Sequence, residues 1–155
     1  LNHGSNESKL KFLIGDFGEC RYIDENSDSL YEANVGTAEF MAPEMISLSG
    51  GGAVLYDEKV DVWSFGMMLF ELLTLDVPYR VNGVDRFALP KLVAGGVRPE
   101  FPAPTKEHNE ALMRLYTRCT EKDANKRPSA KELCKAARRL ATMCELTRGI
   151  SPDRH

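Results

Sequence analysis

The stretch that decides the fold opens with Asp16-Phe17-Gly18 and closes with Gly36-Thr37-Ala38-Glu39-Phe40-Met41-Ala42-Pro43-Glu44. Between these two motifs lies a loop of acidic and hydroxyl side chains without a hydrophobic period. The first tripeptide alone carries little information, because any three residues recur by chance. The second motif, at a fixed distance behind it, makes the pair informative and sets the context for the rest of the chain.

The composition is that of one ordinary globular domain. The chain has 155 residues, of which 43% are hydrophobic and 28% are charged, which is far from the composition of disordered proteins. A formal net charge of -3 provides no electrostatic attraction to nucleic acid or to an anionic membrane. The four cysteines show no C-x-x-C spacing, which favours reduced thiols in a cytoplasmic protein over disulfides or zinc.

The N-terminus carries no recognisable targeting signal. The chain begins with Leu1 and no charged-then-apolar segment follows, as a signal peptide would require. A start without Met indicates a fragment, although a processed or trimmed chain would look the same. The parent protein could still be tethered to a membrane through segments that are not included here.

Hydrophobic spacing predicts a mainly helical fold. The strongest prediction is a helix over residues 60–75, whose apolar side chains leave almost no polar face. Such a helix should be buried on all sides, and it is shorter than the ~20 residues that span a membrane. Pro90 should kink or split the helix that contains it. Further helices are expected over residues 43–47, 85–94 and 109–120 and after the capping box Ser129-Ala130-Lys131-Glu132.

Strands should be few and short. One is expected over residues 11–14, an apolar run that ends at Gly15, and a second over residues 19–22. The fold class is therefore mainly α, with helices around one buried central helix and one or two short strands near the N-terminus. Loops are expected at residues 24–34, at the glycine-rich residues 49–52, at the proline-rich residues 99–104 and in the tail from residue 149.

Two later motifs complete a recognisable set. Asp61-Val62-Trp63-Ser64-Phe65-Gly66 opens the central helix, and a Cys119-x7-Arg127-Pro128 arrangement follows. In this order the four motifs resemble those of the eukaryotic protein kinase domain, from the Asp-Phe-Gly of its activation segment to the end of its large lobe.

The resemblance covers nearly the whole chain. It implies a partial kinase domain over residues 1–146, with the activation segment at 16–44, large-lobe helices at 43–146 and a tail at 147–155; the complete parent domain would be α+β. The Val97-Arg98-Pro99 stretch and the spacing before Arg127-Pro128 look most like the tyrosine-kinase-like group, whose members are mainly specific for Ser and Thr.

The resemblance implies transfer of a phosphoryl group from ATP, with Mg²⁺, to Ser or Thr of protein substrates. Asp16 would be a Mg²⁺ ligand, Phe17 would pack under a small-lobe helix, and Gly18 would let the backbone turn Asp16 in or out of the nucleotide site. The Thr37 hydroxyl would contact the catalytic aspartate and its neighbouring lysine. An ordinary turn carboxylate and turn hydroxyl are the plain alternatives. Phe40 departs from the usual Tyr or Trp, which puts fine positioning of the substrate in question.

Two further positions match a structural pair of the family. Glu44 and Arg127 would form a buried ion pair that ties the end of the activation segment to the last helices. A buried carboxylate needs such a partner to stay charged, and Arg provides two donors in a fixed fork. Their role would be architectural.

The central helix holds the remaining matches. Asp61 would begin the helix and reach the backbone of the catalytic loop; without that loop it would be a buried carboxylate with too few partners. Trp63 belongs to the same motif. Met68 and Leu72 match apolar positions beneath the adenine site, and they are equally well explained as plain core.

The acidic loop offers sites for modification. Ser27, Ser29 and Tyr31 are candidate phosphorylation sites, where an added phosphate would order the loop. The acidic side chains could instead pair with a basic cluster unmodified or remain solvated, and the sequence leaves these alternatives open.

Several parts of a kinase are absent from these 155 residues: a glycine-rich phosphate loop, a strand lysine paired with a helix glutamate, and a His-Arg-Asp-x-x-x-x-Asn catalytic loop. We therefore expect the chain alone to be inactive and to expose part of its central helix as an association-prone patch. The alternative for the parent is a pseudokinase-like scaffold, and a natural short form that competes for the parent's partners is a third hypothesis.

Overall fold

The computed structural model describes residues 13–22, 31–48, 52–101 and 110–148. Its elements, in chain order, are η1 (Phe17–Glu19), β1 (Tyr31–Glu32), η2 (Ala38–Phe40), η3 (Pro43–Met45), β2 (Ala53–Val54), α1 (Lys59–Thr74), η4 (Arg80–Asn82), α2 (Leu89–Ala94), α3 (Glu110–Cys119), η5 (Ala124–Lys126) and α4 (Ala130–Arg148), where η denotes a 3-10 helix. The fold is mainly helical, as predicted. Within these ranges no helix has the length and apolarity needed to cross a bilayer.

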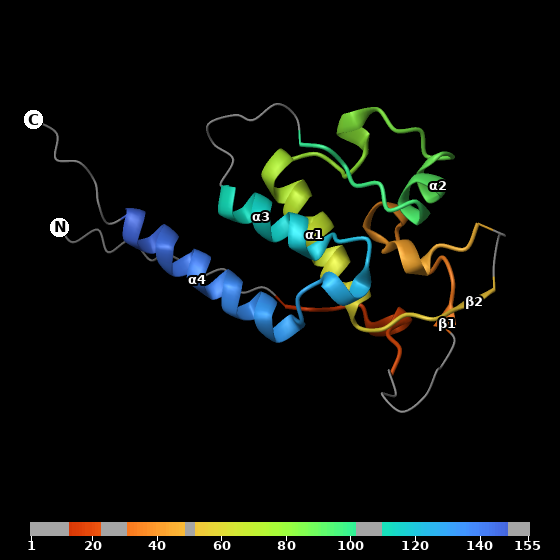
Figure 1. Cartoon of the computed structure of the whole chain (residues 1–155), viewed down its shortest axis with the longest axis horizontal. Coiled ribbons are helices and arrows are strands. Elements are labelled where there is room, and N and C mark those ends of the chain that lie inside the picture. Colours follow the sequence, from red (N-terminus) through yellow and green to blue (C-terminus); the bar gives the residue numbers. More distant parts are fainter. Residues whose placement is uncertain (1–12, 23–30, 49–51, 102–109, 149–155) are drawn as a thin grey trace, which may run out of the picture.

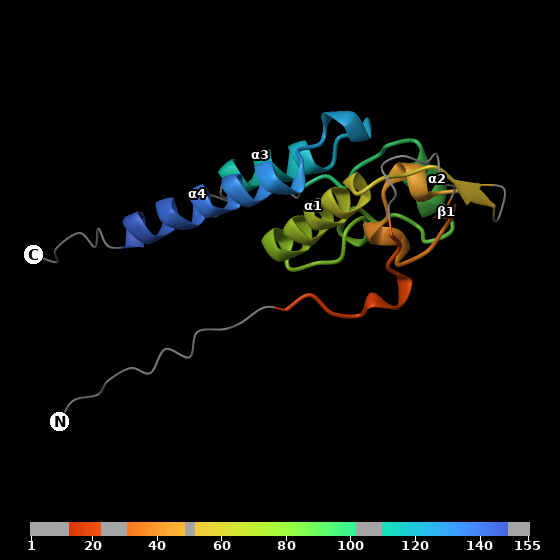
Figure 2. The same cartoon turned by 90° about the horizontal axis from the view of Figure 1, so that it is seen from below.

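Helix α1 occupies the middle of the molecule. Helices α3 and α4 lie on one side of it, and the N-terminal segment that carries η1 runs along the other side (Figure 2). The turns η2 and η3, the two strands and α2 gather near the end where α1 begins (Figure 1). The stretch from Asp16 to Glu44 therefore begins on one side of α1 and ends near its N-terminal end.

Helix α1 agrees with the predicted helix to within one residue at each end. It stops at Leu75, which has left-handed backbone (φ 57°, ψ 27°) and donates its amide to the Glu71 carbonyl at 2.7 Å. The expectation of burial on all sides is wrong, because Met68, Leu72 and Leu75 are 41%, 63% and 88% exposed. No described segment covers this face, which agrees with the expectation that these residues alone leave part of the central helix open.

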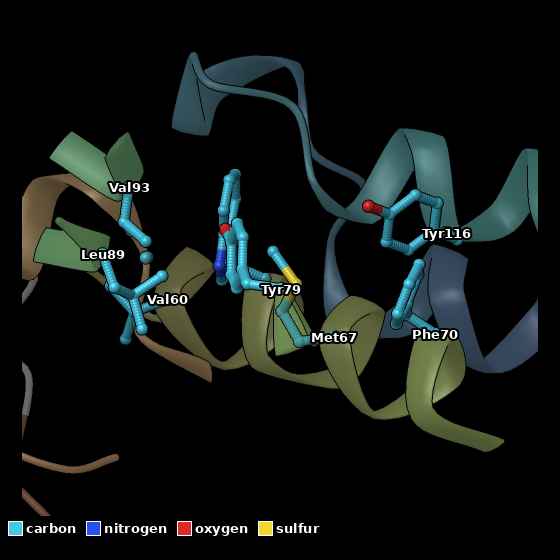
Figure 3. Close-up of a cluster of buried hydrophobic side chains, with 9 residues drawn as sticks. Val60, Met67, Phe70, Tyr79, Leu89, Val93 and Tyr116 are labelled. Atoms are coloured by element: carbon cyan, nitrogen blue, oxygen red, sulfur yellow. The ribbon is translucent and has the colours of Figure 1, made fainter. Parts of the chain in front are cut away.

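The main hydrophobic core forms where α1 meets the turns η2 and η3, α2 and α3. Phe70 of α1 packs against Tyr116 of α3 (Figure 3) with ring centroids 5.8 Å apart, and Phe101 contacts both rings at 4.8 and 5.0 Å. The buried members of this cluster are Ala42, Val60, Trp63, Met67, Phe70, Tyr79, Leu89, Val93 and Tyr116.

A second cluster joins α1 and α3 to α4. Its buried residues are Val62 and Leu69 of α1 and Leu115 and Cys119 of α3. On α4, Leu133, Ala136 and Leu140 pack against them. The capping box before α4 is also present, because Glu132 Oε2 accepts from the Ser129 amide at 2.8 Å and the Glu132 amide donates to Ser129 Oγ at 3.3 Å.

The two predicted N-terminal strands are wrong. Leu13 and Ile14 are irregular and highly exposed, and residues 20–22 are irregular after η1 ends at Glu19; residues 11–12 lie outside the described residues. The strands instead form at β1 and β2, which pair antiparallel with Tyr31 opposite Val54. Strands need a hydrogen-bonding partner. β1 lies inside the predicted loop 24–34, and its partner β2 directly follows the predicted loop 49–52.

Proline starts helices here and does not break them. Pro90 occupies the first turn of α2, where its missing amide loses no helical bond. The predicted kinked helix over residues 85–94 is therefore a turn followed by a short straight helix. Pro43 similarly begins η3, which ends at Met45 and is shorter than predicted.

Gly66 sets the distance between α1 and α3. A Cβ at this position would lie 2.6 Å from Cγ2 of Thr120 and 2.9 Å from Cβ of Cys119, well inside the ~3.5 Å of ordinary carbon contacts. Thr120 and Cys119 are both fully buried and have little room to move aside. A side chain at residue 66 would force the two helices apart.

We expect Gly66→Ala to lower the free energy of unfolding by about 1–2 kcal/mol, because overpacking outweighs the ~1 kcal/mol gained in helix propensity. Gly15→Ala is the control, since no atom lies within 4 Å of a Cβ there. Urea unfolding followed by circular dichroism measures both. Equal midpoints for the two variants would contradict the close approach of α1 and α3.

Candidate functional site

Asp16 stands at the start of η1 with left-handed backbone (φ 60°, ψ 68°). A residue with a Cβ seldom adopts this conformation, and such strain is concentrated at ligand sites. The Asp16 side chain is exposed and makes no capping bond to η1. Phe17 is also largely exposed, and Gly18 has no positive φ, so the freedom expected of that glycine is not used in this arrangement.

Asp16 shares an open pocket of about 280 Å³ with Asp61 from the first turn of α1. Glu19 and Glu58 also line the pocket, and Arg21 is the basic side chain in its lining. Desolvation raises the pKa of Asp61, and repulsion from Glu58 adds to the shift. The expectation of a buried Asp61 is wrong, because its side chain is exposed at this pocket.

The pocket offers carboxylate oxygens to a cation or to hydrogen-bond donors. Among the described residues, no group of three or more His, Cys, Asp or Glu side chains could hold a metal by itself. Mg²⁺ in phosphoryl-transfer sites is held by one or two carboxylates together with phosphate oxygens and waters. The Asp16 carboxylate is exposed and makes no capping bond, so it is free to act as a single protein ligand to nucleotide-bound Mg²⁺.

Thr37 lies at the start of η2 with an exposed side chain that makes no capping bond. The next turn is tied to the central helix, because Ser64 Oγ of α1 donates to the Phe40 carbonyl at 2.8 Å. Phe40 itself packs at the edge of the main core. The structure therefore fixes the backbone around Thr37 and leaves its hydroxyl open to solvent.

Glu44 and Arg127 form a bidentate ion pair. Arg127 Nη1 donates to Glu44 Oε1 at 2.6 Å, and Nη2 donates to Oε2 at 2.8 Å. The Arg127 side chain is 0% exposed and that of Glu44 is 21% exposed. The contact agrees with the pair expected from the sequence, and its shielding from water strengthens each charge-assisted bond.

Arg127 also satisfies backbone carbonyls from two other parts of the chain. Its Nε donates to the Glu121 carbonyl at 2.8 Å, and Nη1 donates to the Lys59 carbonyl at 3.0 Å. Its guanidinium carbon lies 5.0 Å from the ring centre of Trp63, a cation–π distance. Trp63 Nε1 is the one buried side-chain polar atom without a partner among the described residues.

The other predicted positions are dispersed. Met68 and Leu72 lie on the exposed face of α1, so their interpretation as plain core is wrong for this chain. Tyr31 is in β1, where its ring stacks on Tyr56 at 4.9 Å and its hydroxyl donates to the Tyr22 carbonyl at 3.3 Å. Ser27 and Ser29 lie outside the described residues.

Sequence reasoning missed the polar groups that fix the loops around the site. Asn34 has left-handed backbone (φ 60°), and its side-chain amide both donates to and accepts from the Ser47 backbone at 3.1 and 3.0 Å. Tyr79 and Tyr116 donate to the carbonyls of Val97 and Pro99 at 2.9 and 2.8 Å. The presence of Asn34 in an expected loop could have indicated its hydrogen bonds to the backbone. No feature of the sequence indicated which carbonyls Tyr79 and Tyr116 would bind.

We expect Arg127→Met to lower the free energy of unfolding by about 3–5 kcal/mol, because it leaves Glu44 without its partner. The double variant Arg127→Met with Glu44→Leu should recover part of this loss, since neither charge is then unpaired. Arg114→Ala is the control: its ion pair with Glu110 is 73% and 83% exposed and should contribute below about 0.5 kcal/mol. Urea unfolding distinguishes these outcomes, and equal effects of Arg127→Met and Arg114→Ala would contradict the buried pair.

Comparison with known proteins gives a consistent result. The protein kinase domain family matches residues 4–137. A probable LIM domain-containing serine/threonine-protein kinase of Dictyostelium discoideum is 32% identical over 133 residues, which is 86% of this chain and 19% of that protein. Serine/threonine-protein kinase VIK of Arabidopsis thaliana is 32% identical over 138 residues, 87% of this chain and 30% of that protein.

Human mitogen-activated protein kinase kinase kinase 7 is 36% identical over 122 residues, 79% of this chain and 18% of that protein. The chain thus spans less than a third of the length of each of these relatives. The family match extends from before the Asp-Phe-Gly motif into α4 and confirms the resemblance. The chain belongs to the protein kinase domain family.

Proposed function

We propose that this chain is the part of a serine/threonine kinase domain from the Asp-Phe-Gly motif onward, in the tyrosine-kinase-like group. The protein that contains it would transfer the γ-phosphoryl group of ATP to Ser or Thr of protein substrates in the cytoplasm. The observation that carries the proposal is the position of Asp16. Its backbone is left-handed, its carboxylate makes no capping hydrogen bond, and it lines a pocket together with Asp61. Two of the relatives are named as serine/threonine-protein kinases, which supports the same conclusion.

Each residue of the site would have a distinct task. Asp16 would hold Mg²⁺, which neutralises charge shared between the β- and γ-phosphates. Phe17 and Gly18 would set the direction in which Asp16 points. Thr37 would contact the catalytic aspartate through its exposed hydroxyl, on a backbone that the Phe40–Ser64 bond holds in place.

A scaffold without catalysis is the second candidate. The exposed apolar face of α1 around Met68 and Leu72 favours it, because large exposed apolar patches mark interaction surfaces. The two candidates differ in what Asp16 does: phosphoryl transfer requires its carboxylate, whereas a scaffold does not.

The decisive experiment is Asp16→Asn in the whole protein that includes these residues, assayed with ATP, Mg²⁺ and a generic Ser/Thr peptide. We expect kcat to fall by about 100-fold or more, because a main electrostatic contact to the metal is lost. Glu19→Gln is the matched control, since Glu19 lies three residues later in the same pocket lining and should leave kcat within about twofold. Activity that survives Asp16→Asn, or a wild type with no activity, would favour the scaffold.

The chain by itself should not be an enzyme. Its 155 residues contain no glycine-rich phosphate loop and no His-Arg-Asp motif, so we propose that it neither binds ATP tightly nor turns it over. Self-association is its expected behaviour, through the apolar face of α1.

We expect Met68→Gln with Leu72→Gln to reduce self-association of the isolated chain by about tenfold or more, because the pair removes two of the three apolar side chains exposed on this face. Phe87→Gln is the control: Phe87 is 88% exposed but lies before α2, away from this face. Sedimentation velocity over a concentration series measures the effect. A monomeric wild type, or equal effects of the two changes, would refute a role for this face.

A further inference from the structure

Positive charge is concentrated on one pair of helices. Over residues 110–119 and 130–148 the sequence has seven Lys or Arg and three Asp or Glu, although the whole chain has a net charge of -3. These two stretches are α3 and α4, which lie alongside one another in both views (Figure 1, Figure 2). Neither the pocket at Asp16 nor the Glu44–Arg127 pair uses this charge.

A groove of about 370 Å³ lies between the two helices. Its apolar lining includes Leu115 of α3 and Leu140 of α4, which also belong to the second core cluster. Arg114, Arg118 and Arg139 complete it with exposed guanidinium side chains. The groove thus combines an apolar interior with a cationic border drawn from both helices.

Two of the three arginines of this groove have no ion-pair partner among the residues that the structure describes. Arg114 and Arg118 are one turn apart on α3, a spacing at which like charges repel. Arg114 pairs with Glu110 at 3.3 Å in an exposed contact. Neither Arg118 nor Arg139 forms an ion pair with any residue in the described ranges, and Glu132, which feels the charge of Arg118, is already hydrogen-bonded to Ser129.

We propose that the α3–α4 groove binds an acidic amphipathic helix of another protein, with apolar side chains against Leu140 and over the largely buried Leu115, and carboxylates on Arg118 and Arg139. Guanidinium groups bind carboxylates in a bidentate geometry, which gives the charge complementarity. The concave apolar interior favours a helix over a membrane surface or a nucleic-acid duplex, since either of those would reach the arginines but not the leucines. This binding does not depend on phosphoryl transfer.

The test uses the full chain and a fluorescein-labelled helical peptide of roughly 16 residues, with leucines one turn apart and glutamates beside them. Fluorescence anisotropy should show saturable binding. Arg118→Glu with Arg139→Glu should weaken it by about tenfold or more. The matched control is Lys131→Glu with Arg138→Glu, which makes the same charge change at exposed positions of α4 that do not line the groove and should change binding by less than about threefold.

A scrambled peptide of the same composition, whose leucines no longer share a face, should bind at least about tenfold more weakly. Equal binding of the two peptides, or equal effects of the two double variants, would overturn the proposal by indicating non-specific charge attraction. Binding of phosphatidylserine vesicles or duplex DNA in place of the peptide, with the same dependence on Arg118 and Arg139, would also overturn it. So would a dimer of the chain that only Arg118→Glu with Arg139→Glu dissociates. Thermal melts followed by circular dichroism check that each variant is still folded. The milder double variant Arg118→Gln with Arg139→Gln removes the two charges without reversing them and should also weaken peptide binding.

Discussion

The bidentate ion pair between Glu44 and Arg127 is the contact on which the rest of the structure depends. It joins residues 83 positions apart in the chain. The same guanidinium also donates hydrogen bonds to the backbone carbonyls of Lys59 and Glu121. One side chain therefore fixes the end of the proposed activation segment at Glu44, the start of α1 and the turn before α4. Arg does not lose its proton when buried, so the carboxylate opposite is required for the fold.

This anchor divides the proposed activation segment, residues 16–44, into two parts. Its C-terminal part has partners within the chain, since the Phe40 carbonyl binds Ser64 and Glu44 binds Arg127. Its N-terminal part, around Asp16 and Phe17, is exposed and lies on the side of α1 away from α3 and α4 (Figure 2). The segment is held where it supports the fold and left open where a nucleotide would bind.

Helix α1 separates surfaces with different chemistry. The pocket at Asp16 contains the carboxylates of Asp16, Glu19, Glu58 and Asp61 beside one arginine, whereas the groove at Arg118 and Arg139 is cationic with an apolar interior. Because the N-terminal segment with η1 and the helices α3 and α4 lie on opposite sides of α1 (Figure 2), a partner on the α3–α4 groove would leave the Asp16 pocket accessible. The proposed catalysis and the proposed docking could then be altered by separate substitutions.

The sequence by itself determined the features that depend on neighbouring residues or on a family pattern: the helix 60–75, the capping box at Ser129, the kinase family and the pairing of Glu44 with Arg127. Only the tertiary structure decided that β1 pairs with β2, that Asp61, Met68 and Leu72 are exposed, and that arginines of α3 and α4 share a groove. Helical periodicity and caps act within a few residues. Strand pairing and burial depend on which distant segments meet, and this information lies in no local stretch of sequence.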